Sequence, residues 1–284
     1  MVTFTLPSEL RSHFFGRHDK QAYELFFQAV SAALSEKLAA DKALRAATNG
    51  FVAVLHTWTQ QLEFHPHIHC VVAGAGLNER GQFVRVKKPD YLLHLPHLQA
   101  AFRQHLYRLL KENDWPVDPE VWRKDWGVHI QPVGSGVSAL KYLAAYVSRT
   151  AITNARMLQV TQDCVSFRWK DRSQDNRSRE LTLSGVEFVR RYLRHVLPAG
   201  LRSVRYYGFC HPAAKASRMR VQFHSGKTLN VGPVESLPGP APGSSIPLCP
   251  RCGQAMRLVL SVSLWHKTRG PPKQSTRPPT SCAA

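Results

Sequence analysis

Two apolar segments, residues 51–56 and 64–72, lie close together in the sequence and are joined by a short polar link. Each has the length and apolar content of a buried β-strand, and glycine-containing turns stand at their outer ends, at residues 49–50 and 74–76. Two strands with so short a link predict a β-hairpin. We therefore expect the fold to contain an antiparallel sheet.

The rest of the chain mixes helical and strand patterns without strict alternation. Helices are expected at residues 21–48, 98–110 and 137–149, and further strands at residues 82–86, 128–133 and 165–169. Ser184 followed by Glu187 is a capping-box pattern that predicts a helix through Leu197. The pattern favours the α+β class with a mainly antiparallel sheet flanked by helices.

The positive charge of the chain is concentrated in one segment. The formal net charge is +19, and residues 166–228 contribute 14 basic and 4 acidic residues. The partner is therefore expected to be a polyanion, nucleic acid or an acidic membrane surface, although a solvated basic surface is the alternative. No stretch approaches the roughly 18 apolar residues of a membrane-spanning helix, and the N-terminus lacks a signal-peptide pattern.

Histidines accumulate in the second strand of the predicted hairpin. His67 and His69 alternate with Ile68 and Cys70, so both imidazoles point to one face, about 7 Å apart by the strand rise. Two imidazoles on one face can grip a divalent metal, although ordinary solvent-facing histidines are the alternative. Two ligands do not complete a site. The candidates for a third are His65, Glu63, Gln60, Gln61 and His129.

Two tyrosines lie four residues apart in the helix predicted at residues 137–149. Tyr142 and Tyr146 share one helix face, and Lys141 and Arg149 flank them. A tyrosine hydroxyl can be a covalent nucleophile, although a packed aromatic pair is the alternative. Together, a metal-binding strand, paired tyrosines and a basic body provide what phosphodiester transesterification on DNA requires.

The cysteines do not indicate a disulfide framework, because the six are scattered and no export signal is present, so we expect a cytoplasmic protein. Only Cys249 and Cys252 have zinc-ligand spacing, as half of a possible Zn²⁺ ribbon. The expected organisation is a nuclease core at residues 1–160 and a basic α+β DNA-binding extension at 161–231. A proline-rich linker, the cysteine pair and a disordered tail would follow at 232–284.

The motifs resemble those of the two-tyrosine HUH rolling-circle transposases, including the insertion sequence common region type. Residues 65–72, preceded by 56–60, look like the family's HUH block, and residues 140–156 are similar to its tyrosine block. Residues 205–208 are similar to a later segment of the family. Members usually carry an N-terminal zinc-binding region, which we expect to be missing here because the resemblance starts at Val2.

The resemblance implies an HUH-type fold and an HUH single-strand DNA endonuclease and transesterase, a bacterial, nucleoid-associated transposase. Tyr142 and Tyr146 would be the nucleophiles, His67 and His69 the ligands of Mg²⁺ or Mn²⁺, and single-stranded DNA at element ends and target the partner. No membrane partner is expected, and protein partners stay open. The residues expected to contact DNA are Lys141, Arg149, Arg156, Arg168, Lys170, Arg190, Arg191 and Arg194. The alternatives are a truncated, non-catalytic DNA-binding remnant and a rolling-circle replication initiator.

Overall fold

The computed structural model describes residues 1–15, 19–42, 44–88, 90–124, 126–134, 151–171 and 174–225. All of them belong to one unit, Met1–Lys227. The segment with Lys141, Tyr142, Tyr146 and Arg149 lies outside the described residues. So do Cys249, Cys252 and the predicted linker and tail.

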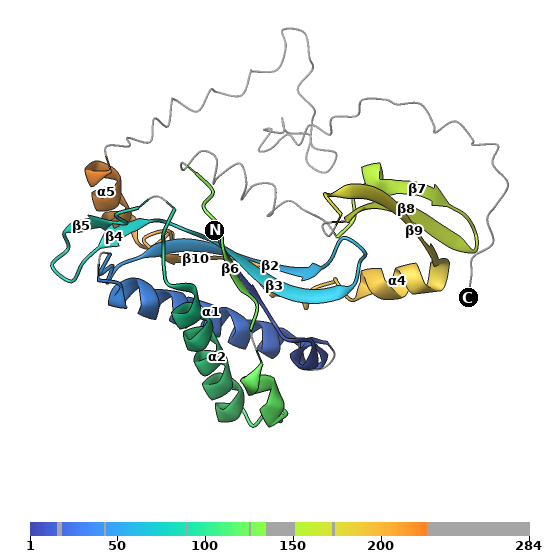
Figure 1. Cartoon of the computed structure of the whole chain (residues 1–284), viewed down its shortest axis with the longest axis horizontal. Helices are drawn as coiled ribbons and strands as arrows, with labels where there is room; N and C mark the ends of the chain where they lie inside the picture. Colours follow the sequence, from blue (N-terminus) through green and yellow to red (C-terminus); the bar gives the residue numbers. More distant parts are fainter. Residues whose placement is uncertain are drawn as a thin grey trace, which may run out of the picture. The chain divides into compact units, whose positions relative to one another are not determined.

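The main sheet has five strands in the order β10-β2-β3-β1-β6, and each neighbouring pair is antiparallel (Figure 1). Its strands are β1 (Val2–Thr5), β2 (Gly50–Trp58), β3 (Phe64–Val72), β6 (Val128–Ile130) and β10 (Val204–Gly208). The predicted hairpin is confirmed as the β2–β3 pair. Together with the helices below, it confirms the α+β class.

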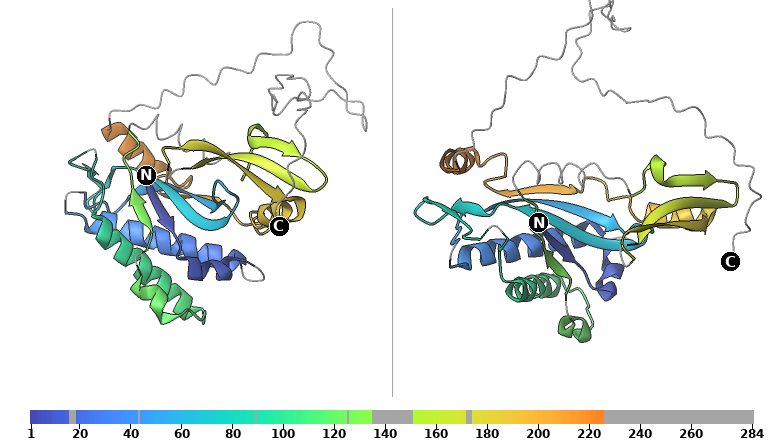
Figure 2. Two further views of the ribbon diagram at one scale, coloured as in Figure 1. Left: turned by 45° about the vertical axis from the view of Figure 1, so that its right-hand side comes forward. Right: turned by 45° about the horizontal axis from the view of Figure 1, so that its top comes forward.

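One face of the main sheet carries the hydrophobic core. The helices α1 (Asp19–Ala40) and α2 (Leu95–Glu112) lie against that face (Figures 1 and 2). Phe4 of the sheet and Phe26 of α1 both pack on Phe102 of α2, with ring centroids 5.0 and 5.9 Å apart. All three rings are fully buried, and burial of each is worth roughly 1.5–3 kcal/mol. Strand β3 contributes Ile68 and Cys70 to this core, so its alternate residues face the other way.

Helix α1 is shorter than expected, and the prediction of a helix to residue 48 was wrong. The Asp41 carboxylate accepts a hydrogen bond from the Leu44 amide at 2.8 Å, and Arg45 has a φ of +39°. A side chain that captures a nearby backbone N–H competes with helix continuation. Leu44 and Ala46 are nevertheless buried, so the apolar pattern continues past the end of the helix.

A second sheet of three strands has the order β7-β8-β9, with β7 (Met157–Val160), β8 (Cys164–Asp171) and β9 (Arg177–Ser184). The alternation predicted at residues 165–169 is confirmed. Val165 and Phe167 are buried, whereas Arg168 and Lys170 on the opposite face are exposed. This sheet therefore presents a basic face.

Helix α4 (Gly185–Leu193) follows the second sheet and begins where the capping box predicts. The Ser184 hydroxyl accepts a hydrogen bond from the Glu187 amide at 3.2 Å. The helix ends at Leu193, before the predicted Leu197, and the chain continues in tighter i→i−3 turns. Pro198 has no N–H to donate to the carbonyl of Arg194, so the last helical bond of the predicted helix is missing.

The remaining elements are short. They are β4 (Ala75–Leu77), β5 (Phe83–Arg85), α5 (Lys215–His224) and the 3₁₀ turns η1 (Ser8–Phe14), η2 (Pro119–Arg123) and η3 (Asn154–Arg156). Strand β10 comes from the segment assigned to a basic extension, yet it pairs with β2 in the main sheet. The expected division at residue 160 therefore does not coincide with a division of that sheet. Within the described part of the chain, no helix is both long and apolar enough to cross a bilayer.

Candidate metal centre and nucleic-acid cleft

Three histidines from the β2–β3 hairpin converge on the face of the main sheet opposite the core. His67 and His69 project together from β3, and His56 lies on β2 directly opposite His67. One ligand nitrogen from each of the three lies within 4.8 Å of the others. With metal–imidazole bonds of about 2.1 Å, neighbouring ligand atoms of a tetrahedral or octahedral site lie roughly 3.0–3.4 Å apart, so the three rings would move closer together when an ion binds. We call His56, His67 and His69 the histidine triad.

His56 was missing from the candidates for a third ligand. Its signal was present in the sequence, because His56 is the last residue of the first predicted strand of the hairpin. Of the candidates named from the sequence, His65, Gln60, Gln61 and His129 line the same cleft but stand outside the triad. Glu63 lines a different pocket.

Hydrogen bonds orient two of the triad rings. The Nδ1–H of His67 donates to the His65 carbonyl at 2.7 Å, so the coordinating atom of this ring is Nε2. The Nδ1 of His69 is hydrogen-bonded to the Thr3 hydroxyl of β1 at 3.0 Å. The His56 ring is buried and stacks on Trp58, with centroids 4.8 Å apart. Rings held in this way suit metal coordination, because outer contacts fix the ring planes before the ion binds.

His65 is in a different electrostatic state from a solvent-exposed histidine. Burial, the neighbouring His67 and the guanidinium of Arg11 lower the pKa of His65 to about 4. The ring is therefore neutral at neutral pH. Its carbonyl, rather than its ring, supports the triad through the bond to His67.

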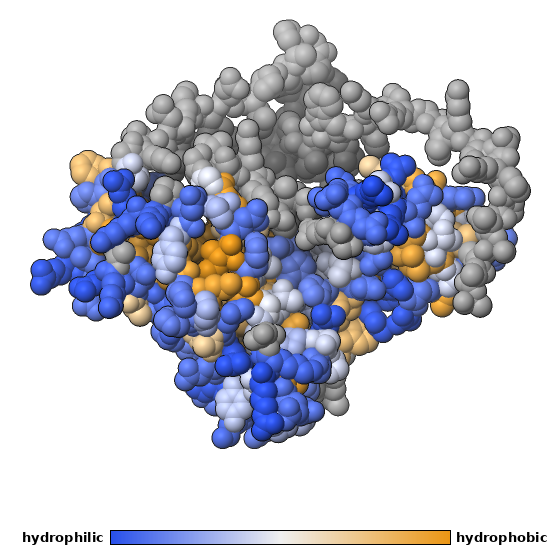
Figure 3. Space-filling view, in the orientation of Figure 1, coloured by the Kyte–Doolittle hydropathy of each residue, from blue (hydrophilic) through white to orange (hydrophobic). Residues whose placement is uncertain are grey.

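The triad opens into a cleft of about 1110 Å³ that is also lined by the second sheet. Arg168 and Lys170 of β8 line it, and Figure 3 shows strongly hydrophilic residues, with hydrophobic ones among them, where β8 and β9 lie. Asp171 also lines the cleft, and its carboxylate pairs with Arg179 at 3.0 Å. The cleft thus brings together three imidazoles and two exposed cations, which suits a phosphate-bearing ligand.

Arg156 lines the same cleft, but its guanidinium is committed to backbone carbonyls. Its Nε donates to the Arg168 carbonyl at 2.8 Å, one terminal nitrogen donates to the Ala151 carbonyl at 3.3 Å, and the other to the Gln60 carbonyl. The Gln60 side chain in turn accepts from the Lys170 amide at 3.2 Å. These bonds tie the turn of the β2–β3 hairpin to strand β8.

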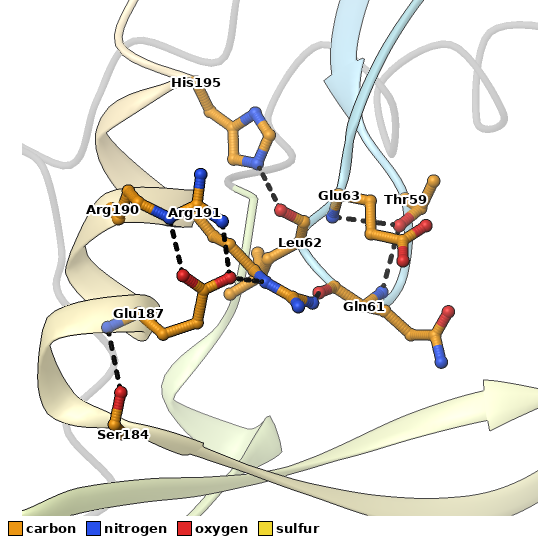
Figure 4. A network of polar contacts seen from close by, with 9 residues as sticks. All are labelled: Thr59, Gln61, Leu62, Glu63, Ser184, Glu187, Arg190, Arg191 and His195. Atoms are coloured by element: carbon orange, nitrogen blue, oxygen red, sulfur yellow. Dashed lines mark hydrogen bonds and ion pairs between the residues drawn. The ribbon is translucent and has the colours of Figure 1, made fainter. Parts of the chain in front are cut away.

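Arg190 and Arg191 of α4, and Arg194 directly after it, lie elsewhere. Arg190, Arg191 and Arg194 line a second pocket of about 560 Å³, whereas Arg156, Arg168 and Lys170 line the cleft of the triad. Arg190 and Arg191 both bind Glu187, at 2.5 and 2.7 Å, and these hydrogen bonds hold the pKa of Glu187 at about 2 (Figure 4).

The sequence of this chain is similar to those of known transposases. A family model described as "Putative transposase" (Y2_Tnp) matches residues 50–218. "Putative transposase y4qJ" of Sinorhizobium fredii (strain NBRC 101917 / NGR234) is 32% identical over 310 residues, covering 96% of this chain and 75% of the relative. The "Transposase for insertion sequence element IS801" of Pseudomonas savastanoi pv. phaseolicola is 25% identical, covering 83% of this chain and 60% of the relative.

Among solved structures, a conjugative relaxase, TrwC, in a metal-bound complex with oriT DNA, matches with a TM-score of 0.32 and 11% identity. The match covers 80% of this chain and 71% of the relaxase chain. The family match, in contrast, spans two parts of the chain that the sequence singles out as candidate site residues. It includes the histidine triad and the whole of residues 137–149.

Proposed function

Because this chain belongs to the Y2_Tnp family of transposases, we propose that it cuts and rejoins single-stranded DNA through 5′-phosphotyrosine intermediates. The reaction would serve rolling-circle-type transposition. The observation that carries the proposal is the histidine triad, which lies in a cleft lined by exposed cations.

The triad would hold the metal. Three nitrogen ligands with no carboxylate in the set suit Mn²⁺ better than Mg²⁺, which prefers oxygen ligands. A bound Mn²⁺ or Mg²⁺ would polarise the scissile phosphate. His67 keeps its Nε2 toward the ion because its Nδ1 proton is held by the His65 carbonyl.

Tyr142 and Tyr146 are our proposed nucleophiles. Gln131 and Ala151, described residues on either side of the tyrosine segment, both line the cleft of the triad. Tyr146 is five positions before Ala151, and five steps along the chain span at most about 18 Å. The tyrosine is therefore tethered to the cleft by the covalent structure alone.

In the cutting step, the tyrosine oxygen bonds to phosphorus while the bond from phosphorus to the 3′ oxygen breaks. The proton lost by the hydroxyl ends on the departing 3′ oxygen. The 5′ end stays on the enzyme as a phosphotyrosine, and attack by another 3′-hydroxyl reverses the step and joins the strands. A second tyrosine allows a second transfer while the first link persists.

Arg168 and Lys170 would hold the strand across the triad. Both are exposed and line the cleft, while their neighbour Phe167 anchors β8 in a small hydrophobic core. Removal of one cation that neutralises a phosphate of single-stranded DNA should lower the slope of log affinity against log salt by about 0.7.

The test is formation of a covalent adduct with labelled single-stranded DNA from element ends in the presence of Mn²⁺. We expect an adduct with the wild-type chain and none with a Tyr142→Phe, Tyr146→Phe double variant. Replacement of His67 and His69 by alanine should abolish the adduct and retain salt-sensitive DNA binding. An adduct that survives both histidine substitutions would refute the metal assignment, and binding with no adduct on any such oligonucleotide would indicate a non-catalytic remnant.

A further inference from the structure

The second pocket lies beside the turn of the β2–β3 hairpin and is rich in arginine. Its lining includes Arg11 and Phe15 from the N-terminal segment and Glu63 from the turn. Arg190 and Arg191 of α4 and the C-cap residue Arg194 complete it. We call it the arginine pocket. Gln60 and Gln61 of the same turn line the metal cleft, so the two sites share the turn as a common wall.

Arg11 gives the clearest sign of a ligand site. Its Nε is buried, and among the described residues it has no hydrogen-bond partner. A buried donor on a permanently charged guanidinium is costly when unsatisfied, and buried polar atoms nearly always find an acceptor. Arg11 lines the pocket, so a small movement of its side chain would let an anionic oxygen in the pocket supply that acceptor.

The charges of the pocket favour an anion. Arg190 and Arg191 share the single carboxylate of Glu187, and Glu63 adds one more negative charge. Arg11 and Arg194 bring the guanidiniums to four against two carboxylates. The net charge of the pocket is therefore positive even with both glutamates ionised.

An aromatic platform accompanies the charge. The Phe15 side chain is 58% exposed, and the Arg194 guanidinium lies 5.5 Å from its ring centroid. The Phe64 ring supports Phe15 from the sheet, edge-on at 6.3 Å. An exposed ring next to guanidiniums suits one nucleotide of single-stranded DNA. Any base can stack on the ring, and the guanidiniums can bind the phosphate.

The pocket is also mechanically linked to the cleft. Arg191 donates to the Gln61 carbonyl at 3.1 Å, and Figure 4 shows this arginine reaching from α4 to the turn. At the next residue of the turn, the Leu62 carbonyl accepts a hydrogen bond from His195 at 3.1 Å. The wall between the two sites is therefore held in place from the side of the arginine pocket.

We propose that the arginine pocket is a second single-stranded DNA subsite, which binds a phosphate and its stacked base where the strand passes from the metal cleft over the β2–β3 turn. The direction of the strand rests on the proposed function, but the binding of single-stranded DNA does not require chemistry. The subsite would lengthen the footprint and keep the strand from leaving the cleft between cutting and joining.

The experiment measures binding by fluorescence anisotropy, without metal, for the full chain and two oligonucleotides. One is short, about 5 nucleotides, and the other is about 20 nucleotides with the same central sequence. The test variants are the Arg11→Gln, Arg194→Gln pair and, separately, Phe15→Leu. The matched control is the Arg108→Gln, Arg123→Gln pair, because both arginines are exposed, ion-paired and outside both sites.

We expect the arginine pair to weaken binding of the long strand about ten-fold more than the control pair does. The salt slope should fall by about 0.7 more than in the control, because the one phosphate bound in the pocket is no longer neutralised. Phe15→Leu should weaken the long strand about five-fold or more, with an unchanged salt slope. Binding of the short strand should change no more than in the control.

Long-strand binding equal to that of the control would overturn the subsite, and so would equal weakening of both lengths. Far-ultraviolet circular dichroism and thermal melts establish whether each variant is folded. If Arg11→Gln prevents folding, Phe15→Leu still tests the proposal, because Phe15 is exposed. The adduct assay separates this proposal from the proposed function. A wild-type adduct with unaltered long-strand binding by the variants refutes the subsite alone, whereas length-dependent weakening without any adduct supports the subsite and refutes the chemistry.

Discussion

Replacement of His56 by glutamine should weaken Mn²⁺ binding at least ten-fold. The His56 ring meets those of His69 and His67 edge-on, with centroids 5.1 and 5.6 Å apart, so it faces the point where the triad nitrogens converge. Loss of a mere outer-shell partner typically costs a metal site 10–100-fold in affinity. Loss of one of three direct ligands should weaken Mn²⁺ binding by more than ten-fold, which corresponds to about 1.4 kcal/mol of binding free energy.

The binding constant would be measured by calorimetric titration with Mn²⁺, and the same variant would be assayed for adduct formation across a Mn²⁺ series. Glutamine keeps much of the volume of the buried ring, and urea unfolding without metal checks that the variant is stable. We expect the adduct to return in part at high Mn²⁺, because two ligands remain.

His65→Gln and His129→Gln are matched controls for this prediction. Both residues line the cleft and both are plausible ligands from the sequence, yet neither belongs to the triad. They should bind Mn²⁺ within about three-fold of the wild type. Wild-type affinity in His56→Gln together with weakened binding in either control would refute the triad.

Three further predictions concern the framework of the site. Arg156→Gln should lower the free energy of unfolding in urea by about 2–4 kcal/mol, because three carbonyls lose a charged donor. The salt slope of DNA binding should stay unchanged, and a slope lower by about 0.7 would instead indicate that Arg156 binds a phosphate. Burial lowers the pKa of His195 below 6.5, so below that pH the unfolded chain takes up a proton that the folded chain does not, and stability should fall as the pH drops. His195→Gln should flatten that fall in urea unfolding measured across pH, and a pH profile identical to the wild type would contradict the assignment. Ser184→Ala should cost about 1 kcal/mol in the same assay and Ser184→Asp should restore most of it, whereas equal stability of all three chains would argue against the cap.

The local strand patterns could be predicted because they depend on period alone. Alternation placed Ile68 and Cys70 in the core and exposed Arg168 and Lys170, and the structure confirms both. The helix patterns were less informative, because the spacing of apolar residues indicates which residues are buried and does not show whether the backbone there is helical. Leu44 remains buried after α1 has ended, so its position in the pattern was correct and the inferred helix was not.

Counting charges identified the basic segment, but it could not show which of its arginines and lysines face a site and which bind other parts of the protein. Arg168 lines the metal cleft, Arg156 is bonded to backbone carbonyls, and Arg194 lies over Phe15 in the arginine pocket. The sequence distance between these residues says nothing about which acceptor each guanidinium reaches. Helix α4 shows a related limit of the sequence pattern. Its apolar residues Val189 and Leu193 lie four positions apart, as in a buried helix face, yet their side chains are 51% and 59% exposed.

The third ligand depends on a feature that spacing along one strand cannot supply. His67 and His69 are paired by the two-residue period of β3, but His56 joins them only because β2 places it opposite His67. In the same register Leu55 lies opposite Ile68, and both are in the core. A slip of one residue would exchange the faces, burying the imidazole of His56 among the helices and turning Leu55 toward the cleft. The hydrophobic core therefore fixes the register, and the register in turn assembles the metal centre.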